Sequence, residues 1–119
     1  MKRCLLVDDS MVSRLMLAEI VQSLEPGAEI IQATNGADAL QRTNQCDHID
    51  VAIIDYNMPG MDGLELAEQL ASLGKIGKMA LLTANIQNTL KSRATDQGLV
   101  FLNKPINQEA ISQFCKDSL

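Results

Sequence analysis

The sequence has almost no aromatic residues. It lacks tryptophan and holds one tyrosine and two phenylalanines among its 119 residues. So few rings leave no stacking platform for single-stranded nucleic acid. A basic surface is also missing, because the formal net charge is −5 and the isoelectric point is about 4.7. Since proteins that bind nucleic acid carry a basic footprint, we expect no nucleic-acid partner.

Long apolar runs are absent as well. No stretch approaches the roughly 20 apolar residues that span a bilayer, and the apolar run after residues 1–3 is too short for a signal peptide. Cys4, Cys46 and Cys115 are widely spaced without a CxxC pair, which fits neither a disulfide framework nor a zinc site. We therefore predict free thiols, no membrane association and a cytoplasmic location.

The composition that remains is typical of one globular domain. Apolar residues make up 46% and charged residues 21% of the chain, close to the averages for such domains. A chain of 119 residues has the length of one domain. We therefore expect residues 1–119 to form a single domain without an output domain.

Short apolar runs alternate with segments of helical spacing along the whole chain. The apolar runs predict strands at residues 4–7, 29–33, 51–54, 79–82 and 99–102. The helical spacing predicts helices at residues 12–24, 36–44, 62–73, 86–94 and 106–115. Right-handed crossovers between such units lead to an α/β fold, with one parallel sheet covered by helices on both faces. The natural expectation is a doubly wound five-stranded sheet of order 2-1-3-4-5.

Polar side chains follow four of the five predicted strands. Asp8 and Asp9 follow the first strand, Asp55 the third, Thr83 the fourth and Lys104 the fifth. Taken singly, each has an ordinary explanation as a capping residue, a turn residue or a solvated lysine. Ligands of doubly wound sheets bind outside the carboxyl ends of the strands, so all five residues are expected at one site.

Three carboxylates at one site require a cation. At a separation of about 5 Å and an effective dielectric constant of about 20, each pair repels by about 3 kcal/mol. Oxygen ligands without histidine or cysteine favour Mg²⁺, for which Mn²⁺ can substitute. A divalent ion, the Lys104 ammonium and the Thr83 hydroxyl together suit a phosphoryl group. Asp55, on the central strand, is best placed as the acceptor of that group.

These residues lie in motifs that resemble the receiver domain of two-component response regulators, the CheY-like family. The resemblance extends over essentially the whole chain and rests on the segments Leu5-Leu6-Val7-Asp8-Asp9-Ser10, Ile54-Asp55-Tyr56-Asn57-Met58-Pro59-Gly60-Met61-Asp62-Gly63, Leu82-Thr83-Ala84 and Phe101-Leu102-Asn103-Lys104-Pro105. It implies a flavodoxin/CheY-like fold and a phosphorylatable signalling switch that acts as no enzyme beyond its own phosphorylation and dephosphorylation.

The resemblance also implies individual roles at the metal site. Asp55 would form an aspartyl phosphate. Asp9, Asp55 and the backbone carbonyl of Asn57 would bind Mg²⁺ directly, while Asp8 would act largely through water. Lys104 would hold the phosphate, and its bond to Pro105 is expected to be cis.

A second group of roles concerns the switch. Thr83 would move towards the phosphoryl group and Phe101 would turn inward behind it, with Pro105 nearby. This movement would reshape the surface formed by helix four, strand five and helix five. Phe101 provides no tyrosine hydroxyl for a partner. Asn57 and Asn85 occupy positions that tune the phosphate lifetime in the family.

The implied partners are a histidine kinase or histidine phosphotransfer protein and an unknown downstream protein, with a monomer or a phosphorylation-dependent dimer as the active form. Three alternatives remain open on the sequence: a small Mg²⁺-dependent phosphatase of haloacid dehalogenase type, a flavodoxin-like cofactor binder and a non-phosphorylated receiver-like adaptor. The phosphatase is disfavoured because its second acidic residue is replaced by Asn57. The cofactor binder lacks a phosphate-cradling loop after the first strand.

Overall fold

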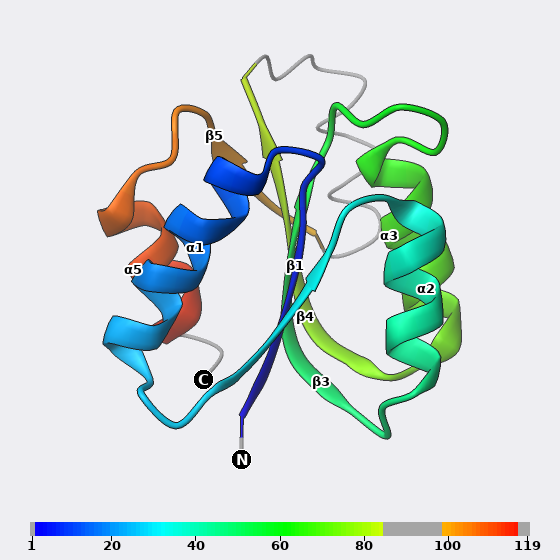
Figure 1. The fold of residues 1–119 in the computed structure, drawn as a ribbon, viewed down its shortest axis with the longest axis horizontal. Helices are drawn as coiled ribbons and strands as arrows, with labels where there is room; N and C mark the ends of the chain where they lie inside the picture. Colours follow the sequence, from blue (N-terminus) through cyan, green and yellow to red (C-terminus); the bar gives the residue numbers. More distant parts are fainter. Residues whose placement is uncertain (1, 85–98, 117–119) are drawn as a thin grey trace.

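Five parallel strands form the centre of the computed structural model, which describes residues 2–84 and 99–116. Their order is β2-β1-β3-β4-β5, so the predicted 2-1-3-4-5 sheet is confirmed (Figure 1). The strands are β1 (Arg3–Val7), β2 (Glu29–Ala33), β3 (Ile49–Asp55), β4 (Ile76–Thr83) and β5 (Val100–Asn103). Because all five run in the same direction, their carboxyl ends meet at one edge of the sheet.

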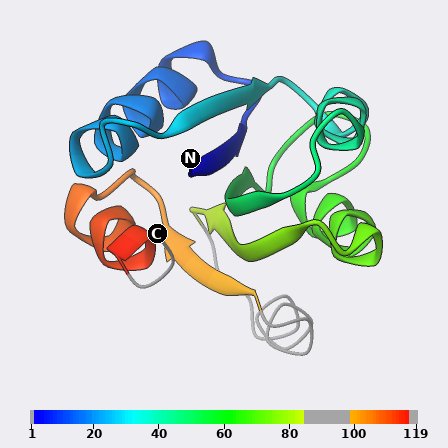
Figure 2. The same cartoon turned by 90° about the horizontal axis from the view of Figure 1, so that it is seen from below.

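Helices cover both faces of this sheet. The described helices are α1 (Met11–Leu24), α2 (Gly36–Asn44), α3 (Gly63–Leu73) and α5 (Gln108–Lys116). Seen along the sheet, α1 and α5 lie on one face and α2 and α3 on the other (Figure 2). Each face has its own apolar cluster of buried side chains. The helix predicted at residues 86–94, together with Asn85, lies outside the described residues.

Two strands begin two or three residues before the apolar runs predict, and β1 begins one residue before. β3 starts at Ile49 instead of residue 51, and β4 at Ile76 instead of residue 79. Polar or small residues interrupt the apolar run in each extension: Asp50 follows Ile49, and Gly77 and Lys78 follow Ile76. Lys78 places its ammonium 5.3 Å from the centre of the Phe114 ring. A search for continuous apolar runs misses such residues, although they pair with the neighbouring strand, as Lys78 pairs with Val51.

Side chains cap the helices that begin at the edge where the strands end. Ser10 accepts a hydrogen bond from the Ser13 amide at the start of α1. Asp62 accepts one from the Glu65 amide at the start of α3, at 2.8 Å. Each cap satisfies an amide that the first helical turn leaves without a partner. The caps thus set where each helix begins after the preceding strand.

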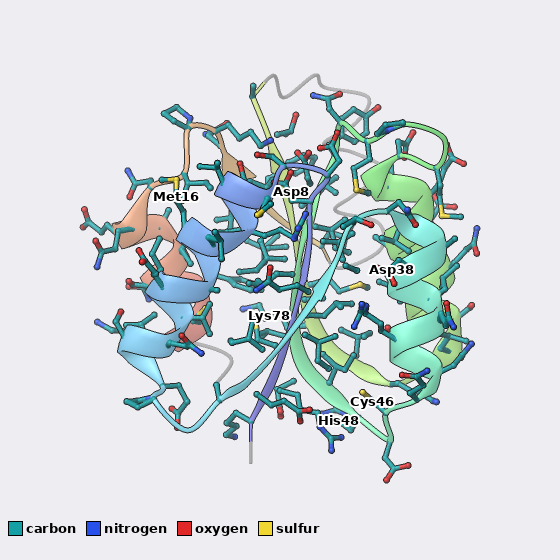
Figure 3. All side chains as sticks on the ribbon, in the orientation of Figure 1. Asp8, Met16, Asp38, Cys46, His48 and Lys78 are labelled. Atoms are coloured by element: carbon teal, nitrogen blue, oxygen red, sulfur yellow. The ribbon has the colours of Figure 1, made fainter. Side chains whose placement is uncertain are left out.

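The two edges of the sheet differ in character. Asp8 lies near the edge where the strands end, whereas Cys46 and His48 lie near the opposite edge (Figure 3).

All three cysteines are free thiols, with Cys4 and Cys115 buried. Within residues 2–84 and 99–116, no helix combines the length and apolar character needed to cross a membrane.

Candidate functional site

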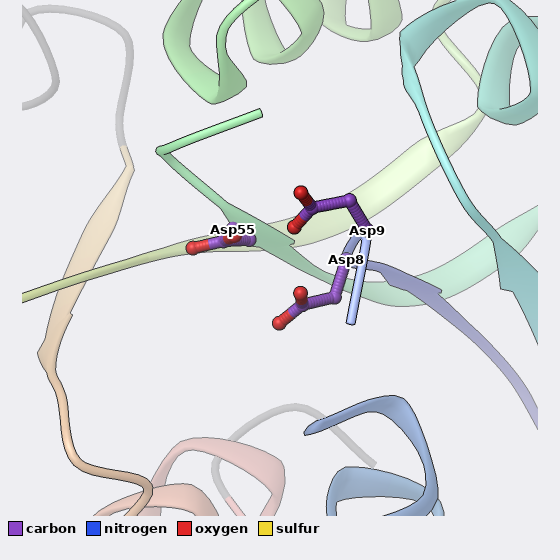
Figure 4. Close-up of side chains that lie close together, drawn as sticks. All are labelled: Asp8, Asp9 and Asp55. Carbon is purple, nitrogen blue, oxygen red and sulfur yellow. The ribbon is translucent and has the colours of Figure 1, made fainter. Parts of the chain in front are cut away.

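Three carboxylates converge where β1 and β3 end. Oxygen atoms of Asp8, Asp9 and Asp55 lie within 4.8 Å of one another, and the three side chains gather in one place (Figure 4). β1 and β3 are adjacent in the sheet, with Val7 paired to Ile54, so the residues that follow this pair in the two chain segments become neighbours. The predicted acidic cluster is therefore present.

The three acids differ in their exposure to solvent. Asp8 and Asp55 are buried, with 1% and 3% of their surface exposed, and Asp9 is exposed. Burial raises the pKa of Asp8 above its ordinary value, and the charges of Asp55 and Asp9 raise it further. The Ser10 amide opposes this effect by donating to Asp8 Oδ1 at 2.9 Å. Ionisation of all three carboxylates is thus unfavourable in free energy without a nearby positive charge.

Lys104, the residue directly after β5, supplies one positive charge. Its Nζ lies 2.7 Å from Asp55 Oδ1, and three-quarters of its side chain is shielded from solvent. The Lys104 amide donates to the Thr83 carbonyl at 2.9 Å, which ties the segment after β5 to the end of β4. The Lys104–Pro105 bond is cis, as predicted. Thr83 is buried at the same edge.

One buried carboxylate oxygen of the cluster remains suited to a hard metal ion. Asp8 Oδ2 accepts no hydrogen bond from the residues that the structure describes. Asp55 Oδ1, in contrast, has the Lys104 ammonium 2.7 Å away as its cationic partner. Buried oxygens of this kind need a cation or ordered water. An oxygen-only set of three carboxylates fits Mg²⁺.

The segment between β3 and α3 forms one wall of the site. Asn57 lies in it and is exposed, so its assignment as a metal ligand through the carbonyl stays a prediction. The Gly63 amide donates to the Tyr56 carbonyl at 2.9 Å. A Cβ at Gly63 would overlap the Asp55 carbonyl oxygen, so glycine allows this close return of the chain.

A cleft of about 540 Å³ opens beside the acidic cluster. It is lined by Asp9, Thr34, Asn35, Gly36, Ala37, Pro59, Gly60 and Met61. Asp9 forms part of its wall, whereas the buried Asp8 and Asp55 do not. The cleft gives solvent and small ions a route to the exposed side of the cluster.

The predicted switch residues lie on β4, β5 and the segment that follows. Phe101 is partly buried and packs against the apolar cluster under α2 and α3. A second hollow, of about 370 Å³, is lined by residues of β5 and the start of α5, including Phe101, Lys104 and Pro105. Movement of Thr83 or Phe101 on phosphorylation stays a prediction.

Two features near the site are not predicted from the sequence. Arg14 donates to the backbone carbonyl of Asp8 at 2.6 Å, although no motif singles it out. The start of α1 exposes large apolar side chains: 63% of Met11, 68% of Val12, 50% of Leu15 and 45% of Met16 is accessible to solvent. Apolar spacing alone suggests core positions here, but the buried face of α1 consists of Leu17, Ala18 and Val21.

Comparison with known proteins gives one consistent result. The family model described as the response regulator receiver domain matches residues 4–116. The sensor histidine kinase RcsC of Escherichia coli is 36% identical over 110 residues, covering 92% of this chain and 11% of that protein. The cyclic di-GMP phosphodiesterase response regulator RpfG of Xanthomonas campestris is 30% identical over 117 residues, covering 96% of this chain and 31% of that protein.

Solved structures agree with these sequence relatives. The chemotaxis protein CheY4 of Vibrio cholerae superposes with a TM-score of 0.85 at 30% identity, covering 100% of this chain and 99% of that chain. A receiver domain from Colwellia psychrerythraea reaches a TM-score of 0.88 at 24% identity, covering 98% and 97%. The match to CheY4 extends over nearly the full length of both chains, whereas the curated relatives are several times longer.

Proposed function

This chain belongs to the response regulator receiver domain family, and we propose that it is a phosphorylation-dependent signalling switch with Asp55 as its phosphoacceptor. Receiver domains accept phosphoryl groups and interact with histidine kinases or phosphotransfer proteins. The observation that carries the proposal is Lys104 Nζ at 2.7 Å from the buried Asp55 carboxylate, beside two further carboxylates. Because the chain belongs to this family, the receiver domain is preferred to the alternative of a haloacid dehalogenase-type phosphatase.

Mg²⁺ is the proposed cofactor. Receiver domains bind it at an acidic cluster, which here is Asp8, Asp9 and Asp55. We assign Asp9, Asp55 and the Asn57 carbonyl as its direct ligands and Asp8 as a ligand through water. When bound, Mg²⁺ neutralises negative charge that develops on the phosphoryl oxygens. Asp8 Oδ2, buried without a hydrogen-bond donor among the described residues, supports an acceptor role towards the ion or its water.

The proposed chemistry is transfer of a phosphoryl group from a phosphohistidine. A carboxylate oxygen of Asp55 attacks phosphorus, so an O–P bond forms while the P–N bond breaks. The electron pair of the P–N bond stays on the imidazole, which leaves neutral because its other nitrogen carries the proton. The Lys104 ammonium pairs with one phosphoryl oxygen and the Thr83 hydroxyl donates to another. Lys104 is already beside Asp55, so it needs little movement to do this.

The exposed apolar start of α1 is the proposed docking surface for the phosphohistidine protein. Met11, Val12, Leu15 and Met16 leave much of their surface exposed. They follow directly after the Asp8-Asp9 pair, so a partner seated on them lies next to the acidic cluster. An apolar patch beside a reactive site is typical of a surface that another protein covers.

The output of the switch is proposed to depend on Thr83, Phe101 and Pro105. Thr83 on β4 pairs in register with Asn103 at the end of β5, and Phe101 lies within β5. A phosphoryl group that draws Thr83 towards Asp55 would therefore change the conformation of β5, by shifting the balance between existing conformations. We propose that a downstream protein, or a second copy of the chain, reads the surface around β5 and α5.

Intact-mass spectrometry tests the acceptor directly. The chain is incubated with Mg²⁺ and acetyl phosphate, and one added phosphoryl group is expected. Asp55→Asn and removal of Mg²⁺ by a chelator should each abolish the adduct. Asp47→Asn, which changes an exposed aspartate outside the cluster, should leave it unchanged. An adduct that persists in Asp55→Asn rules out Asp55, and the absence of any adduct favours the non-phosphorylated adaptor.

A further inference from the structure

Arg14 ties together two strand ends beside the acidic cluster. It lies in the first turns of α1, and its Nη1 donates to the Asp8 carbonyl at 2.6 Å. Its Nε donates to Gln32 Oε1 on β2 at 3.2 Å. The guanidinium therefore connects the segment between β1 and α1 to β2, the strand next to β1. A planar group with several fixed donors is suited to hold two acceptors at once.

Three hydrogen bonds together hold Asp8. Its amide donates to the Ala33 carbonyl at 3.2 Å, its Oδ1 accepts from the Ser10 amide at 2.9 Å, and its carbonyl accepts from Arg14. These contacts leave the buried Oδ2 as the oxygen without a hydrogen bond from the described residues. The carboxylate is thus held on its backbone and on one oxygen while the other is presented to the cluster.

We propose that Arg14, supported by Gln32, is a positioning residue for the Mg²⁺ site. This inference rests on the proposed function and extends it to a residue that is itself no ligand. Arg14 holds the peptide between the two acidic residues, because the Asp8 carbonyl belongs to the peptide bond that joins Asp8 to Asp9. One contact therefore orients both carboxylates. Partners that orient metal ligands commonly affect metal affinity by about 10- to 100-fold.

Arg3 provides a matched control at the opposite end of β1. Its Nε donates to Glu29 Oε2 on β2 at 2.8 Å, and its Nη1 donates to the His48 carbonyl at 3.2 Å. Both arginines thus join a backbone carbonyl to a side chain of β2 through the same two nitrogens. Arg3 acts at the edge where β1 begins, whereas Arg14 acts where β1 ends and the carboxylates gather.

The experiment compares Arg14→Met with Arg3→Met in the full chain. Mg²⁺ affinity is measured by calorimetric titration well below the melting temperature, and hydrogen exchange of the Ser10 amide is measured in metal-free buffer. Arg14→Met should weaken Mg²⁺ binding by about tenfold and speed exchange at Ser10. Arg3→Met should change neither quantity, even where it lowers the melting temperature.

Equal Mg²⁺ affinity in Arg14→Met and the wild type overturns the inference and leaves the proposed function standing. A wild-type chain that binds no Mg²⁺ overturns the proposed function and this inference with it. If Arg14→Met does not fold, Gln32→Leu removes the second anchor of the guanidinium while every carboxylate stays in place. Weaker Mg²⁺ binding by Gln32→Leu supports the positioning role, and unchanged binding overturns it.

Discussion

At the scale of single residues, Asp8 shows how a buried carboxylate lowers the stability of the metal-free protein. The side chain is buried, and burial raises its pKa above the ordinary carboxyl value. The folded protein therefore holds the Asp8 proton at a pH where the unfolded chain has already released it. Metal-free stability consequently falls as pH rises from about 4 through the raised pKa.

Asp8→Asn should remove this loss of stability. Asparagine keeps an oxygen for the Ser10 amide but carries no charge, so we expect the metal-free unfolding free energy to increase at neutral pH. The gain should vanish below about pH 3, where the wild-type carboxyl is protonated in both the folded and the unfolded state. Denaturant unfolding at several pH values, with a chelator present, measures it.

The exposed Asp47 provides the control for this prediction. Asp47→Asn also removes one negative charge, but far from the acidic cluster at the opposite edge of the sheet. Its effect on metal-free stability should be within about 0.5 kcal/mol, as is usual for surface positions. A pH-independent difference between Asp8→Asn and the wild type would contradict the linkage to Asp8 ionisation.

At the scale of elements, α1 serves two purposes along its length. Its middle packs Leu17, Ala18 and Val21 into the core, in the cluster that also contains residues of α5. Its beginning instead leaves Leu15 half exposed beside the acidic cluster. Apolar spacing by itself does not distinguish the two parts, because both show residues at helical intervals. Contact with the sheet decides which part is buried.

Leu15→Glu should separate docking from chemistry. The substitution places a charge in the proposed docking surface, so we expect transfer from a phosphorylated histidine phosphotransfer protein to slow by about tenfold. Phosphorylation by acetyl phosphate should keep its wild-type rate. Leu73→Glu is the matched control, because Leu73 is 37% exposed on α3, on the other face of the sheet. Equal slowing with both phosphoryl donors would place the effect outside docking.

At the scale of the whole molecule, the parallel sheet concentrates negative charge at one edge. The chain carries a net charge of −5, and three of its carboxylates lie within 4.8 Å. Folding brings these groups together, whereas the unfolded chain keeps Asp55 far from Asp8 and Asp9. An ion that binds the cluster therefore favours the folded state by mass action.

Mg²⁺ should accordingly stabilise the chain. At a free concentration ten times Kd, the expected gain in unfolding free energy is about 1.4 kcal/mol. Thermal melts with MgCl₂ measure it, and NaCl of equal ionic strength controls for screening. Asp9→Asn should abolish the gain, since Asp9 is a proposed direct ligand. A melting temperature that ignores millimolar Mg²⁺ contradicts the metal site.

Much of the fold and of the acidic site could be predicted from the sequence. Apolar runs that alternate with helical segments indicate the parallel sheet, and the residues after each run become neighbours because parallel strands end at the same edge. The clustering of Asp8, Asp9 and Asp55 follows from this rule. The points where β3 and β4 begin do not follow from it, since Ile49 and Ile76 pair with each other outside the continuous apolar runs.

The sequence by itself determined the order of elements, the acidic cluster and the family to which the chain belongs, because these depend on local patterns and on the chain direction of neighbouring strands. Only the tertiary structure decided that Arg14 reaches both Asp8 and Gln32, and that Asp8 Oδ2 is buried without a hydrogen bond from the described residues. It also decided that the start of α1 is exposed. These features depend on side chains from different elements meeting in space, which no spacing along the chain encodes.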